Sequence, residues 1–163
     1  MIGKWAQNNK LVNGLPPVAD AFATQGYSDV ISIDDCESVV AFVMTGVSAD
    51  NTNTITVEAC DNVTPSNATA IVFTVSSVVS GDTNDSPTET AVGGKAFTAS
   101  TANQYYIVEI DPADVEAANS HEGRRYVRIK VTEGGNNGAQ LGHIAIFKNN
   151  VQNAQAVLPT AIV

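Results

Sequence analysis

Apolar and polar residues alternate most regularly in the segment RYVRIKVT, residues 125–132. A period of two residues predicts a β-strand with one buried and one exposed face. The apolar face holds Val127, Ile129 and Val131, and the other face holds Tyr126, Arg128 and Lys130. This strand is therefore expected to border a packed core, with its charged side chains pointing outwards.

Further strand-like segments recur at short intervals along the chain. They are residues 29–33, 38–45, 54–60, 70–77, 95–99, 104–110, 139–147 and, less regularly, 154–158. Between them lie clusters of Asn, Asp, Ser, Thr and Gly, which favour turns. Val and Ile total 32 residues against 4 Leu, and such an excess of β-branched residues is typical of strands. The pattern predicts an all-β protein, an antiparallel β-sandwich, with a jelly roll as one form of it.

One short helical turn is expected between two of these strands. Asp111 can accept hydrogen bonds at a helix N-terminus, and Pro112 suits the first helical position. The polar residues that follow Ala118 and the glycine at 123 leave room for about two turns at most. The pattern predicts a helix over residues 112–118.

Residues 1–26 follow neither the strand period nor the helix period. Because two consecutive prolines enforce an extended course, we expect an N-terminal arm here, followed by a sandwich domain over residues 27–163. The arm either packs across its own domain or docks on a neighbour and is dispensable for folding. In the second case the candidate partner contacts are Trp5, Leu11, Leu15, Pro16 and Pro17.

The net charge of the chain and the distribution of its basic residues limit the kinds of molecule that it is expected to bind. The formal net charge is −9, and no Lys or Arg occurs between Lys10 and Lys95. Nucleic acid and anionic membranes are therefore not expected as partners, whereas a basic protein surface is. The main basic cluster consists of Arg124, Arg125, Tyr126, Arg128 and Lys130. It is expected to be either a solvated strand face or a contact with an acidic partner.

The two cysteines and the N-terminal residues bear on where the chain folds. The segment MIGKWAQNNK lacks the apolar centre of a secretory signal, and the apolar run 39–44 is short enough to be a strand. We therefore expect folding in a cytoplasm. In that compartment Cys36 and Cys60 are expected to be free, buried thiols.

The sequence offers little support for catalysis. Its two histidines are His121, in a polar segment, and His143, which is expected to share a strand face with Ala145 and Phe147 as a core or interface residue. No nucleophile elbow, phosphate-binding loop or dinucleotide fingerprint is present. We expect no catalytic residues and no cofactor.

A metal site is not expected either. In the loop 80–94 the spacing of Asp82, Asn84, Ser86 and Thr88 begins like a calcium loop. The central glycine and the final glutamate of such a loop are missing. The interpretation favoured here is a surface loop.

Three C-terminal motifs resemble a known group of proteins. They are VEIDPADV (residues 108–115), GRRYVRIKVT (123–132) and the strand GHIAIF (142–147), which is followed by Leu158-Pro159. In this order they resemble the capsid decoration, or cement, proteins of tailed bacteriophages. The resemblance covers little more than the C-terminal third of the chain.

The resemblance implies a function and a partner. It implies a non-enzymatic β-rich virion protein that binds the outside of an assembled icosahedral shell of major capsid protein, after folding in the host cytoplasm. It also implies self-association, for which a homotrimer on a local threefold axis is expected. Two alternatives stay open: another virion component such as a tail, neck or fibre subunit, and a secreted β-sandwich adhesin or carbohydrate-binding module.

Overall fold

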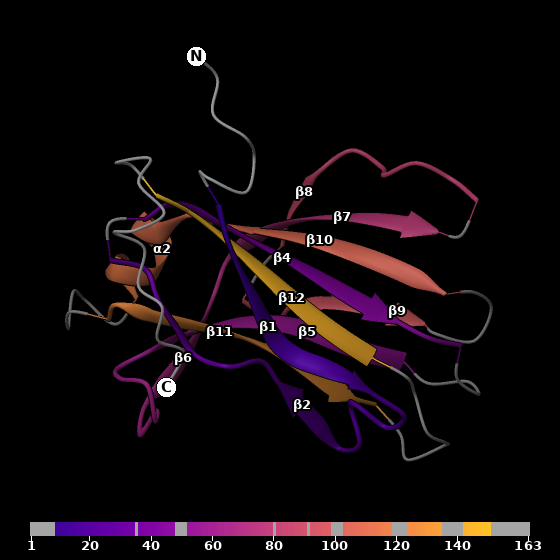
Figure 1. The fold of residues 1–163 in the computed structure, drawn as a ribbon, viewed down its shortest axis with the longest axis horizontal. Coiled ribbons are helices and arrows are strands. Elements are labelled where there is room, and N and C mark those ends of the chain that lie inside the picture. Colours follow the sequence, from indigo (N-terminus) through magenta and orange to yellow (C-terminus); the bar gives the residue numbers. More distant parts are fainter. Residues whose placement is uncertain are drawn as a thin grey trace.

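The computed structural model describes residues 9–34, 36–47, 52–79, 81–90, 92–98, 103–118, 124–134 and 142–150. Within them the chain forms two antiparallel sheets packed face to face, so the predicted β-sandwich is confirmed (Figure 1). A short helix, α2 (Pro112–Ala117), lies at one end of the sandwich. No helix in the described part of the chain is long and apolar enough to cross a membrane.

Sheet A contains six strands, all paired antiparallel. Their spatial order is β1 (Asn9–Val18), β12 (Gly142–Asn150), β4 (Cys36–Thr45), β10 (Gln104–Ile110), β7 (Phe73–Val79) and β8 (Thr88–Thr90). The first and last described strands are therefore neighbours, and β1 forms one edge of the sheet.

Sheet B packs behind sheet A in the view of Figure 1. Its main path runs β2 (Gln25–Tyr27), β11 (Tyr126–Glu133), β5 (Thr52–Cys60) and β6 (Ala68–Ile71). Two short strands join it, β3 (Ile31–Ser32) beside β11 and β9 (Lys95–Thr98) beside β5.

The core lies between the two sheets and is built from the inward face of each strand. Val127, Ile129 and Val131 of β11 are buried, as the alternation predicted, and they face residues such as Val43 and Val108 of sheet A in one continuous cluster. Burial of such aliphatic side chains is the main stabilising contribution, about 1.5–3 kcal/mol each. The predicted phase of β11 is thus confirmed.

The predicted helix is confirmed, and its N-terminus forms as expected. The Asp111 side chain accepts a hydrogen bond from the Ala113 amide at 2.8 Å, and Pro112 occupies the first turn. Val115 points into the core and is fully buried. Because one apolar side chain anchors the helix, α2 closes this end of the sandwich.

The expectation of a separate arm is wrong for the described residues 9–26. Strand β1 pairs with β12 from Asn9↔Asn149 to Val18↔Gly142, and Val12 lies in the core. The strand period was hidden because the register shifts at Gly14 and again before Val18. Residues 1–8 lie outside the described part of the chain.

The turn after β1 also belongs to the domain. Phe22 is 1% exposed and packs against the start of β12, where a Cβ atom added to Gly142 would lie 2.3 Å from Phe22 Cζ. Only glycine allows this close approach. The N-terminal segment therefore packs across its own domain, which is the first of the two alternatives.

Both cysteines are free thiols; Cys60 is buried and Cys36 is half-buried. Burial raises the pKa of the Cys60 thiol to about 11. We expect iodoacetamide at mildly alkaline pH to leave Cys60 unmodified in the folded protein, because the thiolate is the reactive species, and to modify it in denaturant. Mass spectrometry of the peptides measures this, and rapid modification of Cys60 in the native state would contradict it.

Candidate interaction surfaces

The outward side of sheet A, here called the sheet A face, carries three rows of side chains that run across the strands. Row one is Leu11, Phe147, Val40, Glu109, Thr74 and Glu89; row two is Asn13, Ala145, Phe42, Ile107 and Ser76; row three is His143, Met44, Tyr105 and Val78. Rows two and three contain no carboxylate, lysine or arginine. The centre of this face is therefore apolar and uncharged.

The outward side of sheet B has the opposite character. Its paired positions carry Thr54, Thr56, Glu58, Arg128 and Lys130. A polar outer face of this kind is ordinary for a solvated antiparallel sheet. The contrast singles out the sheet A face, onto which Figure 1 looks directly.

Aromatic side chains dominate the middle of the sheet A face. The rings of Phe42 and Phe147 pack edge to face, with centroids 5.1 Å apart. Towards its margins, Leu11 is 57% exposed and Tyr105 is 44% exposed. A contiguous apolar surface rimmed by polar groups marks an interaction site.

Sequence reasoning did not identify this face, although a signal was present. The segment 38–45, SVVAFVMT, is apolar at nearly every position. In β4 the alternate residues Val39, Ala41 and Val43 fill the core, so Val40 and Phe42 point outwards. Strands that are apolar on both faces are typical of sheets covered on both sides. The run therefore predicts that β4 is apolar on its outward face as well as on its core face.

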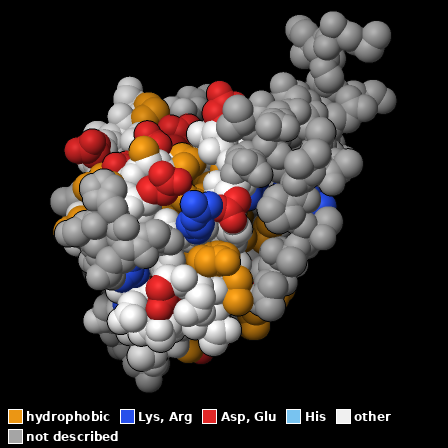
Figure 2. All heavy atoms as spheres, turned by 90° about the vertical axis from the view of Figure 1, so that its left-hand side faces the viewer, with side chains coloured by type: hydrophobic (Ala, Val, Ile, Leu, Met, Phe, Trp, Pro, Cys, Tyr) orange, Lys and Arg blue, Asp and Glu red, His pale blue; other side chains and the backbone are white. Residues whose placement is uncertain are grey.

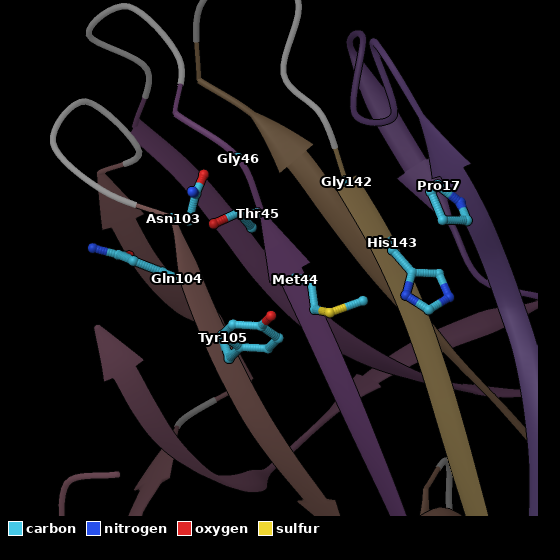
Figure 3. Close-up of a pocket in the computed structure, with 9 residues that line it drawn as sticks. All are labelled: Pro17, Met44, Thr45, Gly46, Asn103, Gln104, Tyr105, Gly142 and His143. Carbon is cyan, nitrogen blue, oxygen red and sulfur yellow. The ribbon is translucent and has the colours of Figure 1, made fainter. Parts of the chain in front are cut away.

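A hollow of about 250 Å³ opens at the row-three end of the sheet A face. Figure 3 shows Met44 between Tyr105 and His143, with Pro17 beyond His143. The rest of the lining is Thr45, Gly46, Asn103, Gln104 and Gly142. The walls are apolar side chains and uncharged polar groups, which suit an apolar side chain from a partner.

His143 forms one wall of this hollow. It shares a face with Ala145 and Phe147 as expected, but that face points outwards, so its assignment as a core residue is wrong. Its Nε2 lies 3.0 Å from Asn13 Oδ1, an acceptor, which places the proton on Nε2. Nδ1 is buried, is turned towards Met44 and has no partner among the described residues. Among the residues that the structure describes, no carboxylate orients His143 as a catalytic base.

The opposite end of the sheet A face is acidic. Glu109 and Glu89 flank Thr74 in row one, and with Asp111 and Asp114 they line a small notch near α2. Burial raises the pKa of Asp114, and the neighbouring carboxylates Asp111 and Glu89 raise it further. No group of three His, Cys, Asp or Glu side chains among the described residues is arranged to hold a metal ion.

The basic cluster predicted on β11 is engaged within the protein. Glu58 accepts from Arg128 Nε at 2.8 Å and lies 3.4 Å from Lys130 Nζ. The Arg128 guanidinium also stacks 4.2 Å from the centre of the Tyr27 ring. Tyr126 is half-buried on the same face. These charges are largely paired, so the solvated strand face is the better interpretation of Arg128.

Two neighbouring arginines have different surroundings. Arg124 is 2% exposed, and its Nη1 donates to the carbonyl oxygens of Ala59 at 2.8 Å and Asn67 at 3.0 Å. It is therefore not a surface contact. Arg125 is exposed and forms an ion pair with Asp34 at 2.8 Å. Of the predicted basic contacts, Arg125 is the one most available to a partner.

This difference predicts unequal stability effects. Arg124→Ala should lower the free energy of unfolding by about 1–3 kcal/mol, because the buried Ala59 carbonyl and the Asn67 carbonyl both lose their donor. Arg125→Ala serves as the matched control and should cost less than about 1 kcal/mol. Urea unfolding measures both. Equal effects would show that Arg124 is not a structural residue.

The predicted partner-contact residues on β1 also differ in their exposure. Leu11 lies on the sheet A face, whereas Leu15 is half-buried and packs against the core. Pro16 and Pro17 are exposed near the end of β1, and Pro17 borders the hollow. Trp5 lies outside the described residues, as does His121.

The loop considered for calcium is exposed over residues 81–89. Asp82 accepts from the Thr83 amide, and Asp85 accepts from the Ser77 amide and hydroxyl at 2.6 Å each. These bonds lower the pKa of Asp85. Its carboxylate thus ties the loop back to β7, as in an ordinary surface connection.

Comparisons with known proteins give one likeness to report. No protein-family model matches this sequence, and no curated protein matches it. Among solved structures the chain is similar to the SPBc2 prophage-derived protein YomS, with a TM-score of 0.41 and 11% identity, over 86% of this chain and 93% of that one. A likeness at this level does not establish a shared function.

Proposed function

We propose that this chain is a non-enzymatic structural protein of a phage virion, a decoration protein that binds the outside of an assembled icosahedral capsid and stabilises it. The observation that supports this most is the apolar, uncharged centre of the sheet A face. Such a face suits a protein that works as one layer of a larger assembly. The resemblance of residues 108–115 and 123–132 to decoration proteins suggests which assembly.

The described residues also favour a structural role over catalysis. His143 is held by an amide and has no acidic partner, and both described cysteines have a raised pKa. A catalytic residue needs a convergent acid, base or nucleophile at hydrogen-bond distance. His121→Ala and His143→Ala should therefore leave the biological role intact apart from a loss of stability.

The proposed partner is the major capsid protein on the capsid exterior. A net charge of −9 suits an exterior position, away from packaged nucleic acid, which would repel it. Addition to the shell would follow folding in the host cytoplasm. In this role neither a cofactor nor a membrane is needed.

Purified particles provide the test. Mass spectrometry of virions should find this chain in many copies, and cryo-electron microscopy should place it on the outer surface of the head. Particles made without it should lose their contents at a lower temperature. Absence from purified particles would overturn the proposal, and location in the tail would replace it with another virion role.

A further inference from the structure

The sheet A face needs a specific occupant. We infer that it is the interface between two copies of this chain, related by a two-fold axis that lies in the interface and runs across the strands at row two, near Phe42. This deepens the proposed function and rests on it, since it assumes that the chain is an assembly component. The dimer would be a second sandwich interface, with sheet A packed on sheet A about 10 Å apart.

The size of the face is sufficient for such a dimer. Five of its six strands, β1, β12, β4, β10 and β7, make up most of it. At a spacing of about 4.8 Å and about seven residues of about 3.4 Å each, the face measures roughly 24 by 24 Å. Two copies would bury about 1,100 Å² in total, which exceeds the roughly 1,000 Å² expected of a specific interface.

The distribution of charge on the sheet A face favours a second copy of the chain as the occupant and sets the direction of the axis. Row one contains Glu109 and Glu89, whereas row three contains no charged residue. Figure 2, which views the α2 end, shows acidic side chains gathered there. Lys148, at the same end, points inwards and donates to the Ser32 carbonyl. The acidic end of this face therefore needs a hydrogen-bond donor from its partner.

An axis across the strands places row one of each copy over row three of the other. Glu109 of one copy then lies over Tyr105 of the other, whose hydroxyl can donate to the carboxylate. An axis parallel to the strands would instead place Glu109 over Phe147 and bury its charge against a ring. Row three of one copy thus supplies a hydrogen-bond donor, the Tyr105 hydroxyl, to the acidic row one of the other copy.

The shape of the face agrees with this arrangement. Row three contains the hollow between Tyr105 and His143 (Figure 3), and row one presents Val40 and Phe147 at the matching strands β4 and β12. An apolar side chain of one copy can enter the hollow of the other. Phe42, at the axis, meets its own counterpart.

The first test is the oligomeric state of the free protein. Sedimentation equilibrium at micromolar concentration should show a dimer. Phe42→Glu should weaken it by at least about a hundredfold, because two unpaired carboxylates meet at the axis. Thr132→Glu, on the outward side of sheet B, is the matched control and should remain dimeric. Circular dichroism checks that both variants are folded.

The second test addresses the register. Tyr105→Glu should weaken the dimer by placing a carboxylate opposite Glu109, and adding Glu109→Arg should restore it. A strict monomer, a trimer, or a dimer unaffected by Phe42→Glu would overturn the inference. The inference would also be overturned if the free protein were monomeric and Phe42→Glu abolished its attachment to particles. That result would show that the sheet A face binds the capsid shell. Finding the dimer while the chain is absent from virions would refute the proposed function alone.

Discussion

Ile129→Asp is expected to abolish folding of the sandwich. Ile129 is 1% exposed at the centre of β11, and it packs among core residues of both sheets. An unpaired carboxylate at this position has no donor, so it costs about 3–5 kcal/mol in addition to the lost packing. That is comparable with the whole stability of a domain, about 5–15 kcal/mol. Circular dichroism and urea unfolding measure the loss.

Three further variants on β11 test whether the buried charge causes the loss of folding in Ile129→Asp. Ile129→Val should cost only about 0.5–1.5 kcal/mol, since it removes one methyl group. Thr132→Asp introduces the same charge on the outward side and should change stability by less than about 0.5 kcal/mol. Arg128→Ala removes the contacts with Glu58 and Tyr27 and should cost about 1 kcal/mol. Unfolding by Arg128→Ala but not by Ile129→Asp would refute the strand phase.

Deleting residues 1–18 is expected to be nearly as severe. The deletion removes β1, takes Val12 out of the core and uncovers the inward residues Ile144 and Ile146 of β12. It also leaves β12 as a long apolar edge strand, which favours aggregation. The truncated protein should be insoluble or lack a cooperative unfolding transition, as expression and urea unfolding would show.

Trypsin offers an independent measurement on the intact protein. Lys10 lies within β1, opposite Lys148 of β12, so its peptide bond should resist cleavage until the strand detaches. Deletion of residues 1–6, which keeps β1 whole, is the control and should preserve the unfolding midpoint. A folded protein of residues 19–163 with an unchanged midpoint would show that β1 behaves as a dispensable arm.

The candidate surfaces could be predicted only in part. The exposure of Leu11 and Pro17 and the outward position of Arg128 agree with the sequence pattern. Arg124 could not be placed, because its burial depends on the carbonyls of Ala59 and Asn67, which lie far away in the sequence. The chain contains the residues of the sheet A face at separated positions, and only their register brings them together.

The sequence by itself determined the fold class, the phase of β11 and the helix at Pro112–Ala117. These depend on local physics: side chains alternate along an extended chain, and a helix needs an N-terminal acceptor. The tertiary structure alone decided that β1 is an edge strand beside β12 and that His143 points outwards. It also decided that Phe42, Ile107 and Ala145 meet on one uncharged face. Pairing and register follow from contacts between distant segments, and periodicity within one strand cannot specify which neighbour it will have.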